Sequence, residues 1–457
     1  MRGFLGTLLA LLCLAPAAAA NRPNVILIMA DDMGFETLNP YGGVSYQTPA
    51  LSKLAAEGTR FTHVYSQPIC TPSRNKIMTG RANRRNYISF GTLLREETTF
   101  AHLLKDAGYV TGVVGKWQLT GDHPGWATRG RGSTPEQAGF DEYALWAYRH
   151  NMTAAENERY VRESGVEGRT SRYWAPAIRI NGEYQATSRD VYGPDVFAEY
   201  ALDFIERHKD ERFLLYYPMV LTHDPFQPTP SSRDRSDQTK FGDDQRFFGD
   251  MVAYTDRIVG RIVEQVDRLG LAENTLILFT QDNGTQRGVA SKLMDRTVMG
   301  GKGSPKDSGN HVALVARWAG VTTPGGVSDD LVDFSDFLPT LVEAADAKLP
   351  EDVVLDGRSF LRQIRGEEGD PRSFILMDYD RDPDRPKGRF PSVRFARTKR
   401  YKLYSDGRFY DVPHDWEEER PIPEGEAGEL GEAIRKKLTA ELAKVPAWRK
   451  PDGTQHP

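Results

Sequence analysis

The feature that most constrains the fold is a regular alternation of short apolar runs with amphipathic segments. Residues 24–29 (NVILIM) form a continuous apolar run, which is typical of a strand buried on both faces of a sheet. Similar runs at residues 109–114, 213–217 and 275–279 are separated by segments with helical spacing, the longest at residues 251–269. Strands that alternate with amphipathic helices predict an α/β fold with a mostly parallel central sheet flanked by helices.

The sequence changes in character after about residue 350. Residues 400–403 and 408–412 flank Asp406-Gly407, a pair typical of a hairpin turn, and residues 429–445 have the pattern of a helix. These features predict a small α+β layer with an antiparallel sheet.

A chain of 457 residues is longer than the roughly 250–300 residues at which single cores stop growing. We therefore expect a large α/β domain over residues 21–350 and a smaller C-terminal α+β domain over residues 351–457. Residues 122–190 are polar and rich in glycine and arginine, with few periodic segments. We expect them to form an insertion on the substrate side, over the sheet edge.

The first twenty residues form a segment of a different kind. Arg2 precedes an apolar run at residues 4–14, Pro16 interrupts it, and residues 18–20 are alanines. This pattern predicts a secretory signal peptide over residues 1–20 and therefore an exported protein, periplasmic or secreted. The run is shorter than the ~20 residues that span a bilayer, so we expect no membrane insertion. A net charge of −5 gives no support to a nucleic-acid partner.

The sequence contains two cysteines, Cys13 and Cys70, and Cys13 lies in the predicted signal peptide. The mature chain therefore cannot form an internal disulfide, which favours a bacterial periplasm. A lone cysteine in an exported protein is either a buried bystander or a group with chemistry of its own.

Polar side chains follow three of the predicted strands. Asp31-Asp32 follows the first strand, Lys116 follows the strand that ends at Val114, and Asp282-Asn283 follows the strand that ends at Phe279. Ligands of open α/β sheets bind outside the carboxyl ends of the strands. Carboxylate and amide oxygens are ligands of hard cations such as calcium. Each pair alone is compatible with a helix cap or a solvated loop, but together they predict a metal site.

The most specific motif is CTPSR at residues 70–74, followed by TGR at residues 79–81. Pro72 and Ser73 are suited to opening a helix, which would place Cys70 at its positive N-terminal end. C-x-P-S-R followed by T-G-R resembles the motif of the formylglycine-dependent type I sulfatases, the arylsulfatase-like branch of the alkaline phosphatase superfamily.

Other blocks of that family have counterparts in the same order and spacing. They are a strand ending in paired Asp (28–34), Gly-Lys-Trp (115–117), His before Pro (222–226), Asp-Asn-Gly (282–284), Gly-Lys-Gly (301–303), a strand ending in Trp-x-Gly (312–320) and DFSDFLPTL (333–341). The resemblance implies that the large domain is alkaline-phosphatase-like.

The resemblance also implies a mechanism. A formylglycine-generating maturation enzyme would oxidise Cys70 to an aldehyde, whose hydrate attacks sulfur and later releases sulfate by collapsing back. Calcium would be held by Asp31, Asp32, Asp282, Asn283 and an oxygen of the modified Cys70.

Four further residues receive roles from the resemblance. Arg74 would hold the hydrated nucleophile, and Lys116 and Lys302 would neutralise the sulfate oxygens. His223 would protonate the leaving alcohol or contact the sulfate. A loop lysine is usually solvated and a lone histidine is usually structural, so these roles depend on the surrounding blocks.

The chain departs from the family pattern at Gln118. The family usually has a histidine directly after Gly-Lys-Trp, which is thought to help deprotonate the hydrate so that sulfate leaves. Glutamine forms hydrogen bonds but does not accept a proton at neutral pH. Either another group takes this role, or turnover is slow, or the substrate differs.

The leading hypothesis is a sulfatase that acts on a sulfated small molecule or carbohydrate. The alternatives are a phosphodiesterase or phosphonate-ester hydrolase of the same superfamily, or a non-catalytic protein that binds sulfated glycans. The complete nucleophile motif counts against the last of these. Candidate substrate contacts are Tyr148, Arg149, Trp174 and Arg179 in the insertion, Asp307 and His311 after Lys302, and Arg394, Arg397 and Lys399 near the C-terminus.

Overall fold

The computed structural model of the protein describes residues 22–122, 129–185, 187–349, 351, 353–381, 383 and 392–445. The predicted signal peptide, residues 1–20, lies outside the described residues, as does part of the predicted insertion.

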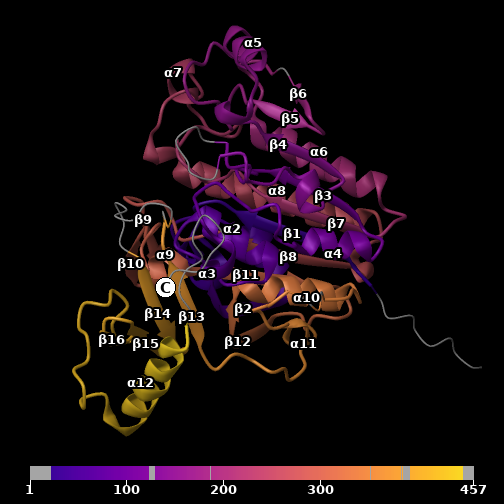
Figure 1. The fold of residues 1–457 in the computed structure, drawn as a ribbon. Coiled ribbons are helices and arrows are strands. Elements are labelled where there is room, and N and C mark those ends of the chain that lie inside the picture. Colours follow the sequence, from indigo (N-terminus) through magenta and orange to yellow (C-terminus); the bar gives the residue numbers. More distant parts are fainter. Residues whose placement is uncertain are drawn as a thin grey trace, which may run out of the picture.

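A ten-stranded mixed sheet runs through the larger part of the molecule, in the order β12-β2-β11-β8-β1-β7-β3-β4-β5-β6 (Figure 1). Its strands are β1 (Asn24–Ala30), β2 (Thr59–Tyr65), β3 (Val110–Gly115), β4 (Glu142–Trp146), β5 (Ile178–Ile180), β6 (Glu183–Gln185), β7 (Phe213–Pro218), β8 (Thr275–Gln281), β11 (His311–Arg317) and β12 (Gly326–Asp333). The neighbours β8, β1, β7, β3 and β4 all run parallel. The predicted mostly parallel sheet is confirmed.

Helices cover both faces of this sheet, which explains the continuous apolar runs. In β1, Ile26 and Ile28 pack on one side, together with residues of α1 (Pro49–Glu57), α6 (Gly193–Arg207) and α8 (Phe248–Arg268). Val25 and Leu27 point to the other side, together with residues of α2 (Cys70–Thr79), α4 (Phe100–Asp106) and α10 (Phe337–Ala344). Each fully buried aliphatic side chain contributes about 1.5–3 kcal/mol, so the centre of the sheet is firmly fixed.

The predicted edge insertion contains more regular structure than its sequence indicated. Strands β4, β5 and β6 continue the sheet, and α5 (Ala154–Ser164) packs beyond them at one end of the molecule (Figure 1). Asn181 and Gly182 join β5 to β6 with φ values of 46° and 91°, the left-handed conformation that a tight hairpin turn requires.

The C-terminal part forms a separate antiparallel layer at the opposite end (Figure 1). Its strands are β13 (Ile375–Tyr379), β14 (Val393–Arg397), β15 (Tyr401–Tyr404) and β16 (Phe409–Asp411). Helix α12 (Gly428–Ala443) covers this sheet, with Leu438 packed against Leu403 and Phe409. The antiparallel layer and its hairpin at Asp406-Gly407 are therefore confirmed.

The remaining α-helices and strands of the described residues are short. They are α3 (Asn83–Asn86), α7 (Asp237–Lys240), α9 (Asp307–Asn310), α11 (Leu361–Ile364) and the hairpin of β9 (Ala290–Leu293) with β10 (Arg296–Met299). Within the described part of the chain, no helix combines the length and the apolar character needed to cross a bilayer.

Candidate active site

The predicted site residues meet at one end of the parallel strands. Asp31-Asp32 follows β1, Lys116 follows β3, His223 lies on the loop after β7, and Asp282-Asn283 follows β8. These four strands are neighbours in the order β8-β1-β7-β3. Parallel neighbours end at the same edge of a sheet, so each short loop delivers its polar side chain to one place.

The two carboxylates after β1 have different partners. Lys116 Nζ donates to both oxygens of Asp31 at 2.8 Å. Asp32 accepts from Asn283 Nδ2 at 2.9 Å and from the Lys302 ammonium. The Asp32 backbone N–H donates to Asp282 Oδ1 at 3.1 Å. All three aspartates are fully buried, so these contacts form in a region of low dielectric.

The pKa values of these buried carboxyls depend on which charged side chains lie close to each of them. Burial alone would raise the pKa of Asp31, but the charges of Lys116, His223 and Arg74 outweigh burial and hold the pKa well below its usual range. Burial and the nearby Asp31 charge hold the pKa of Asp282 well above its usual range. A bound cation would remove this conflict by stabilising the ionised form of both groups.

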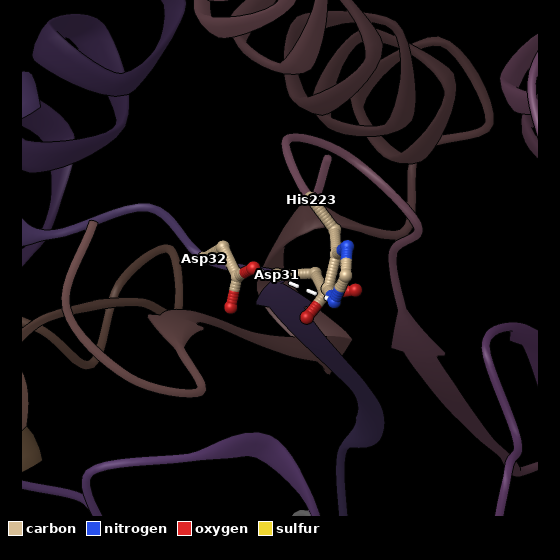
Figure 2. A group of neighbouring side chains, drawn as sticks. All are labelled: Asp31, Asp32 and His223. Carbon is tan, nitrogen blue, oxygen red and sulfur yellow. Dashed lines mark ion pairs between the residues drawn. The ribbon is translucent and has the colours of Figure 1, made fainter. Parts of the chain in front are cut away.

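Two unpaired oxygens support a hard cation at this place. Asp282 Oδ2 and Asn283 Oδ1 are buried and have no hydrogen-bond partner among the described residues. A buried acceptor without a donor is unfavourable, whereas carboxylate and amide oxygens are suited to calcium. Ligand atoms of Asp31, Asp32 and His223 lie within 4.8 Å of one another (Figure 2). Because calcium prefers oxygen, the aspartates are better suited to it than the imidazole.

Cys70 is the first residue of α2 and is 2% exposed. The sequence predicts a helix that opens at Pro72, whereas the structure begins it two residues earlier. Proline is tolerated there because the first-turn N–H groups have no intrahelical partner. The helix N-terminus places partial positive charge beside the Cys70 side chain, which favours an anion.

Arg74 lies one turn after Cys70 on the same helix. Its Nη1 donates to the Lys116 carbonyl at 2.7 Å, and its Nε is 3.9 Å from Asp282 Oδ2. Nε and Nη2 are buried and have no hydrogen-bond partner among the described residues. The guanidinium thus retains donors for a polar group built on Cys70.

His223 approaches Asp32, with Nε2 3.5 Å from Asp32 Oδ2 (Figure 2). Lys302 contacts the same carboxylate. His223 Nδ1 is 2.6 Å from the Asp224 carbonyl oxygen and 3.0 Å from Asp224 Oδ1, so we assign its hydrogen to Nδ1. His223 Nε2 is 3.2 Å from Lys302 Nζ. Burial lowers the pKa of His223, and Lys302 lowers it further. Burial also opposes the charge on Lys302, but Asp32 raises its pKa above the usual range and keeps it an ammonium.

Gln118 is half-buried and adopts φ = 53°, in the left-handed region. Such a conformation costs about 1–2 kcal/mol for a residue other than glycine, so the surrounding structure holds it in place. Together with Cys70, His223 and Lys302, it lines a cavity of about 1340 Å³. Arg74 and Lys116 are buried beneath this cavity.

Much of the remaining cavity wall comes from parts of the chain without family motifs. Trp146, Tyr148, Arg149 and Arg172 form what we call the insertion wall. Of the expected substrate contacts in the insertion, Tyr148 and Arg149 therefore line the cavity, and Trp174 and Arg179 do not.

The substrate contacts expected nearer the C-terminus do not line the cavity, and other residues do. Arg394, Arg397 and Lys399 pair with Asp378, Asp307 and Asp329 away from the described lining, and His311 lies near Asp307. Tyr379 and Arg381 line the cavity instead. No motif marks these two residues or Arg172, so the sequence gives no signal that would have found them.

Four side-chain cations surround three carboxylates at the base of the cavity. The cations are Arg74, Lys116, Arg172 and Lys302, and the carboxylates are Asp31, Asp32 and Asp282. With four cations and three carboxylates, the formal net charge of this group is positive even before a divalent cation is added. The base of the cavity is therefore suited to an anion.

Comparisons with known proteins identify the family. The sulfatase family model matches residues 23–347. The chain belongs to the sulfatase family. This sulfatase is 33% identical over 410 residues to arylsulfatase A of Homo sapiens, covering 85% of this chain and 76% of the relative. It is 31% identical over 383 residues to N-acetylgalactosamine-6-sulfatase of Canis lupus familiaris, covering 77% and 68%.

Solved structures share the fold at lower identity. One is a protein in complex with its substrate D-glucosamine-2-N,6-O-disulfate, with a TM-score of 0.72 and 21% identity, covering 93% of this sulfatase and 97% of that chain. Another is the phosphonate monoester hydrolase of Agrobacterium radiobacter, with a TM-score of 0.66 and 20% identity, covering 92% and 95%. The predicted family and enzyme class are confirmed, whereas the roles of single residues and the domain boundaries stay predictions.

Proposed function

We propose that this sulfatase removes sulfate from a sulfated carbohydrate in an exported compartment, through formylglycine made from Cys70 and with calcium. The observation that carries the proposal is that Cys70, at a helix N-terminus, lines the same cavity as His223 and Lys302, which contact the carboxylate cluster. The maturation enzyme that oxidises Cys70 would be its partner before folding is complete.

The metal part of the proposal rests on the unpaired oxygens. Asp31, Asp32, Asp282 and Asn283, with an oxygen of the modified Cys70, would hold calcium. When bound, calcium supplies Lewis acidity toward a sulfate oxygen and stabilises negative charge.

The chain's own residues account for the rest of the chemistry. Arg74 orients the nucleophile through the donors that have no hydrogen-bond partner in the described part of the chain. Lys116 and Lys302 offset charge on the sulfate oxygens. As the nucleophile bonds to sulfur, the S–O bond to the alcohol breaks, and the alcohol oxygen takes the Nε2 proton of His223 in its imidazolium form, while the Asp224 contacts hold the Nδ1 hydrogen. Gln118 donates a hydrogen bond to the bound groups.

The carbohydrate part of the proposal rests on the size of the cavity and on the relatives. A cavity of about 1340 Å³ exceeds the roughly 300–1,000 Å³ of ordinary small-molecule pockets and has room for more than one sugar ring. A relative is named N-acetylgalactosamine-6-sulfatase, and a structural neighbour was solved with a disulfated glucosamine. Steryl-sulfatase of Mus musculus is a relative as well, at 30% identity, so sterol esters belong in the test.

A substrate panel tests this function. The matured enzyme, with calcium, is assayed on sulfated mono- and oligosaccharides, a steryl sulfate, 4-nitrophenyl sulfate, 4-nitrophenyl phosphate and a phosphonate monoester. We expect the highest kcat/KM on a sulfated sugar and the same step to be lost in Cys70→Ala. Preferred turnover of the phosphonate or phosphate ester would replace the proposal with the superfamily alternative. Preferred turnover of the steryl sulfate would overturn the carbohydrate assignment.

A further inference from the structure

Arg172 is a largely buried cation of the active site that comes from outside the family motifs. It lies on the connection between α5 and β5, within the insertion wall, and its side chain is 11% exposed. Its guanidinium carbon lies 4.1 Å from the ring centroid of Trp146, and its Nη1 is 3.7 Å from Asp31 Oδ2. Arg172 therefore reaches the carboxylate cluster from the edge of the sheet.

The Arg172 guanidinium is only weakly paired by the described residues around it. Both oxygens of Asp31 already accept from Lys116 at 2.8 Å, a shorter contact than the 3.7 Å to Arg172. Arg172 Nη1 is buried and has no hydrogen-bond partner among the described residues. A buried charged donor without an acceptor is costly, and a guanidinium fork is suited to the oxygens of carboxylate, phosphate or sulfate. The missing partner is thus expected to be an anion in the cavity that Arg172 lines.

The backbone around Arg172 is fixed to the loop that carries His223. Tyr173, the next residue, donates through its hydroxyl to the His223 carbonyl at 2.5 Å and to the Val220 carbonyl at 2.8 Å. A Cβ on Gly193 would lie 2.2 Å from the Arg172 carbonyl oxygen, so the backbone segments at residues 172 and 193 are in direct contact. Arg172 and His223 therefore form one rigid frame, as a preorganised binding site requires.

We propose that Arg172 is a substrate-binding residue of this sulfatase, whose guanidinium binds charged oxygens of the sulfate ester from the Asp31 side, while Lys302 and His223 bind it from the Asp32 side. The inference rests on the proposed function in one respect, because it takes the bound anion to be a sulfate ester. No family block contains Arg172, so the insertion contributes to the reacting end of the substrate as well as to the rim.

The test separates anion binding from turnover. Full-length Cys70→Ala protein, loaded with calcium, does not turn over substrate and is titrated with inorganic sulfate and with 4-nitrophenyl sulfate by calorimetry. Adding Arg172→Gln is expected to weaken both affinities by about 10- to 100-fold, the effect of a lost charged hydrogen bond. Adding Arg172→Lys, which keeps the charge but loses the fork, is expected to give an intermediate affinity.

Arg179→Gln is the matched control. Arg179 lies in the same segment and pairs with Glu156 at 2.9 Å, outside the described cavity lining, so its loss is expected to leave sulfate affinity unchanged. Sulfate affinity that stays unchanged in both folded Arg172 variants would overturn the inference. If circular dichroism shows that Arg172→Gln does not fold, the sulfate affinity of Arg172→Lys decides the question in its place.

A second readout excludes a purely structural role. In the matured enzyme, Arg172→Ala is expected to lose kcat/KM by about 10- to 100-fold, and added guanidinium ion is expected to restore part of it. A loss with no recovery, together with normal sulfate affinity, would assign Arg172 to packing. If the matured enzyme turns over no sulfate ester but the Arg172 variants still lose sulfate affinity, the proposed function fails and this inference stands.

Discussion

The base of the cavity and its insertion wall are built in different ways. The three carboxylates and Lys116 at the base directly follow β1, β3 and β8, three strands buried on both faces. The insertion wall lies at the end of β4 and just after it, or on the connection between α5 and the three-residue strand β5 near the sheet edge. The base therefore inherits its geometry from the core, whereas the wall depends on a few local tethers such as those of Tyr173. We therefore expect substitutions at the base to have large effects, and substitutions in the wall to have smaller, graded effects.

The largest effect is expected at the nucleophile. Cys70→Ala should reduce turnover to background, at least about 10³-fold, because no covalent step remains. The fold should be retained, because the change removes one sulfur atom at a helix start. Release of sulfate from the best ester of the panel measures the first point, and thermal unfolding measures the second. Full activity in the variant would break the assignment of Cys70.

Removal of the metal or of one ligand should have the next largest effect. Chelation, or Asp282→Asn, is expected to lower kcat by about 10²-fold or more, because the charge that offsets the buried carboxylates is lost. Adding calcium back should restore the chelated wild type but not the variant. Asp370→Asn at the surface serves as the control. Unchanged activity after verified metal depletion would contradict a metal site at the base.

The two regions should also differ in stability. Ile26→Ala in β1 is expected to lower the free energy of unfolding by about 2–5 kcal/mol, because the substitution leaves a cavity in the fully packed sheet centre. Ile180→Ala in β5 should cost less than about 1.5 kcal/mol, because that side chain is half-buried. Urea unfolding monitored by fluorescence compares the two. Equal losses would mean that the insertion is as firmly held as the core.

Gln118 tests a smaller effect at the base itself. Gln118→His restores the imidazole that the family usually has there, and histidine is tolerated in the left-handed conformation. We expect kcat to rise by about 10-fold and a new basic group to enter the pH profile of kcat, because the hydrate then has a proton acceptor. Steady-state rates from pH 5 to 9 provide the measurement. An unchanged kcat and pH profile would show that another group already takes this proton.

The sequence predicts the base of the cavity better than it predicts the insertion wall. The strands β1, β3, β7 and β8 lie within two residues of their predicted positions, because continuous apolar runs flanked by turns leave little choice. The sequence therefore also predicts that the polar residues after these strands gather at one edge of the sheet. The predicted start of α2 is wrong by two residues, because Pro72 belongs to the first turn without being the first helical residue.

The insertion is less predictable for physical reasons. Asn181-Gly182 is a hairpin signal, but strands of three residues on either side are too short to show a clear alternating pattern. Arg172 carries no such signal, because an arginine in a polar loop is usually solvated. Its burial arises from Trp146 and Asp31, which tertiary structure brings together. Tyr379 reaches the cavity from the C-terminal sheet in the same way.

The most direct test of the central claim is mass spectrometry of the Cys70 peptide from protein coexpressed with a formylglycine-generating enzyme, paired with a sulfate-release assay on the same sample. Conversion of the thiol to an aldehyde lowers the peptide mass by about 18 Da. We predict this mass loss, and sulfate release that rises in proportion to the converted fraction. An unmodified Cys70 in protein that still releases sulfate would contradict formylglycine at this position.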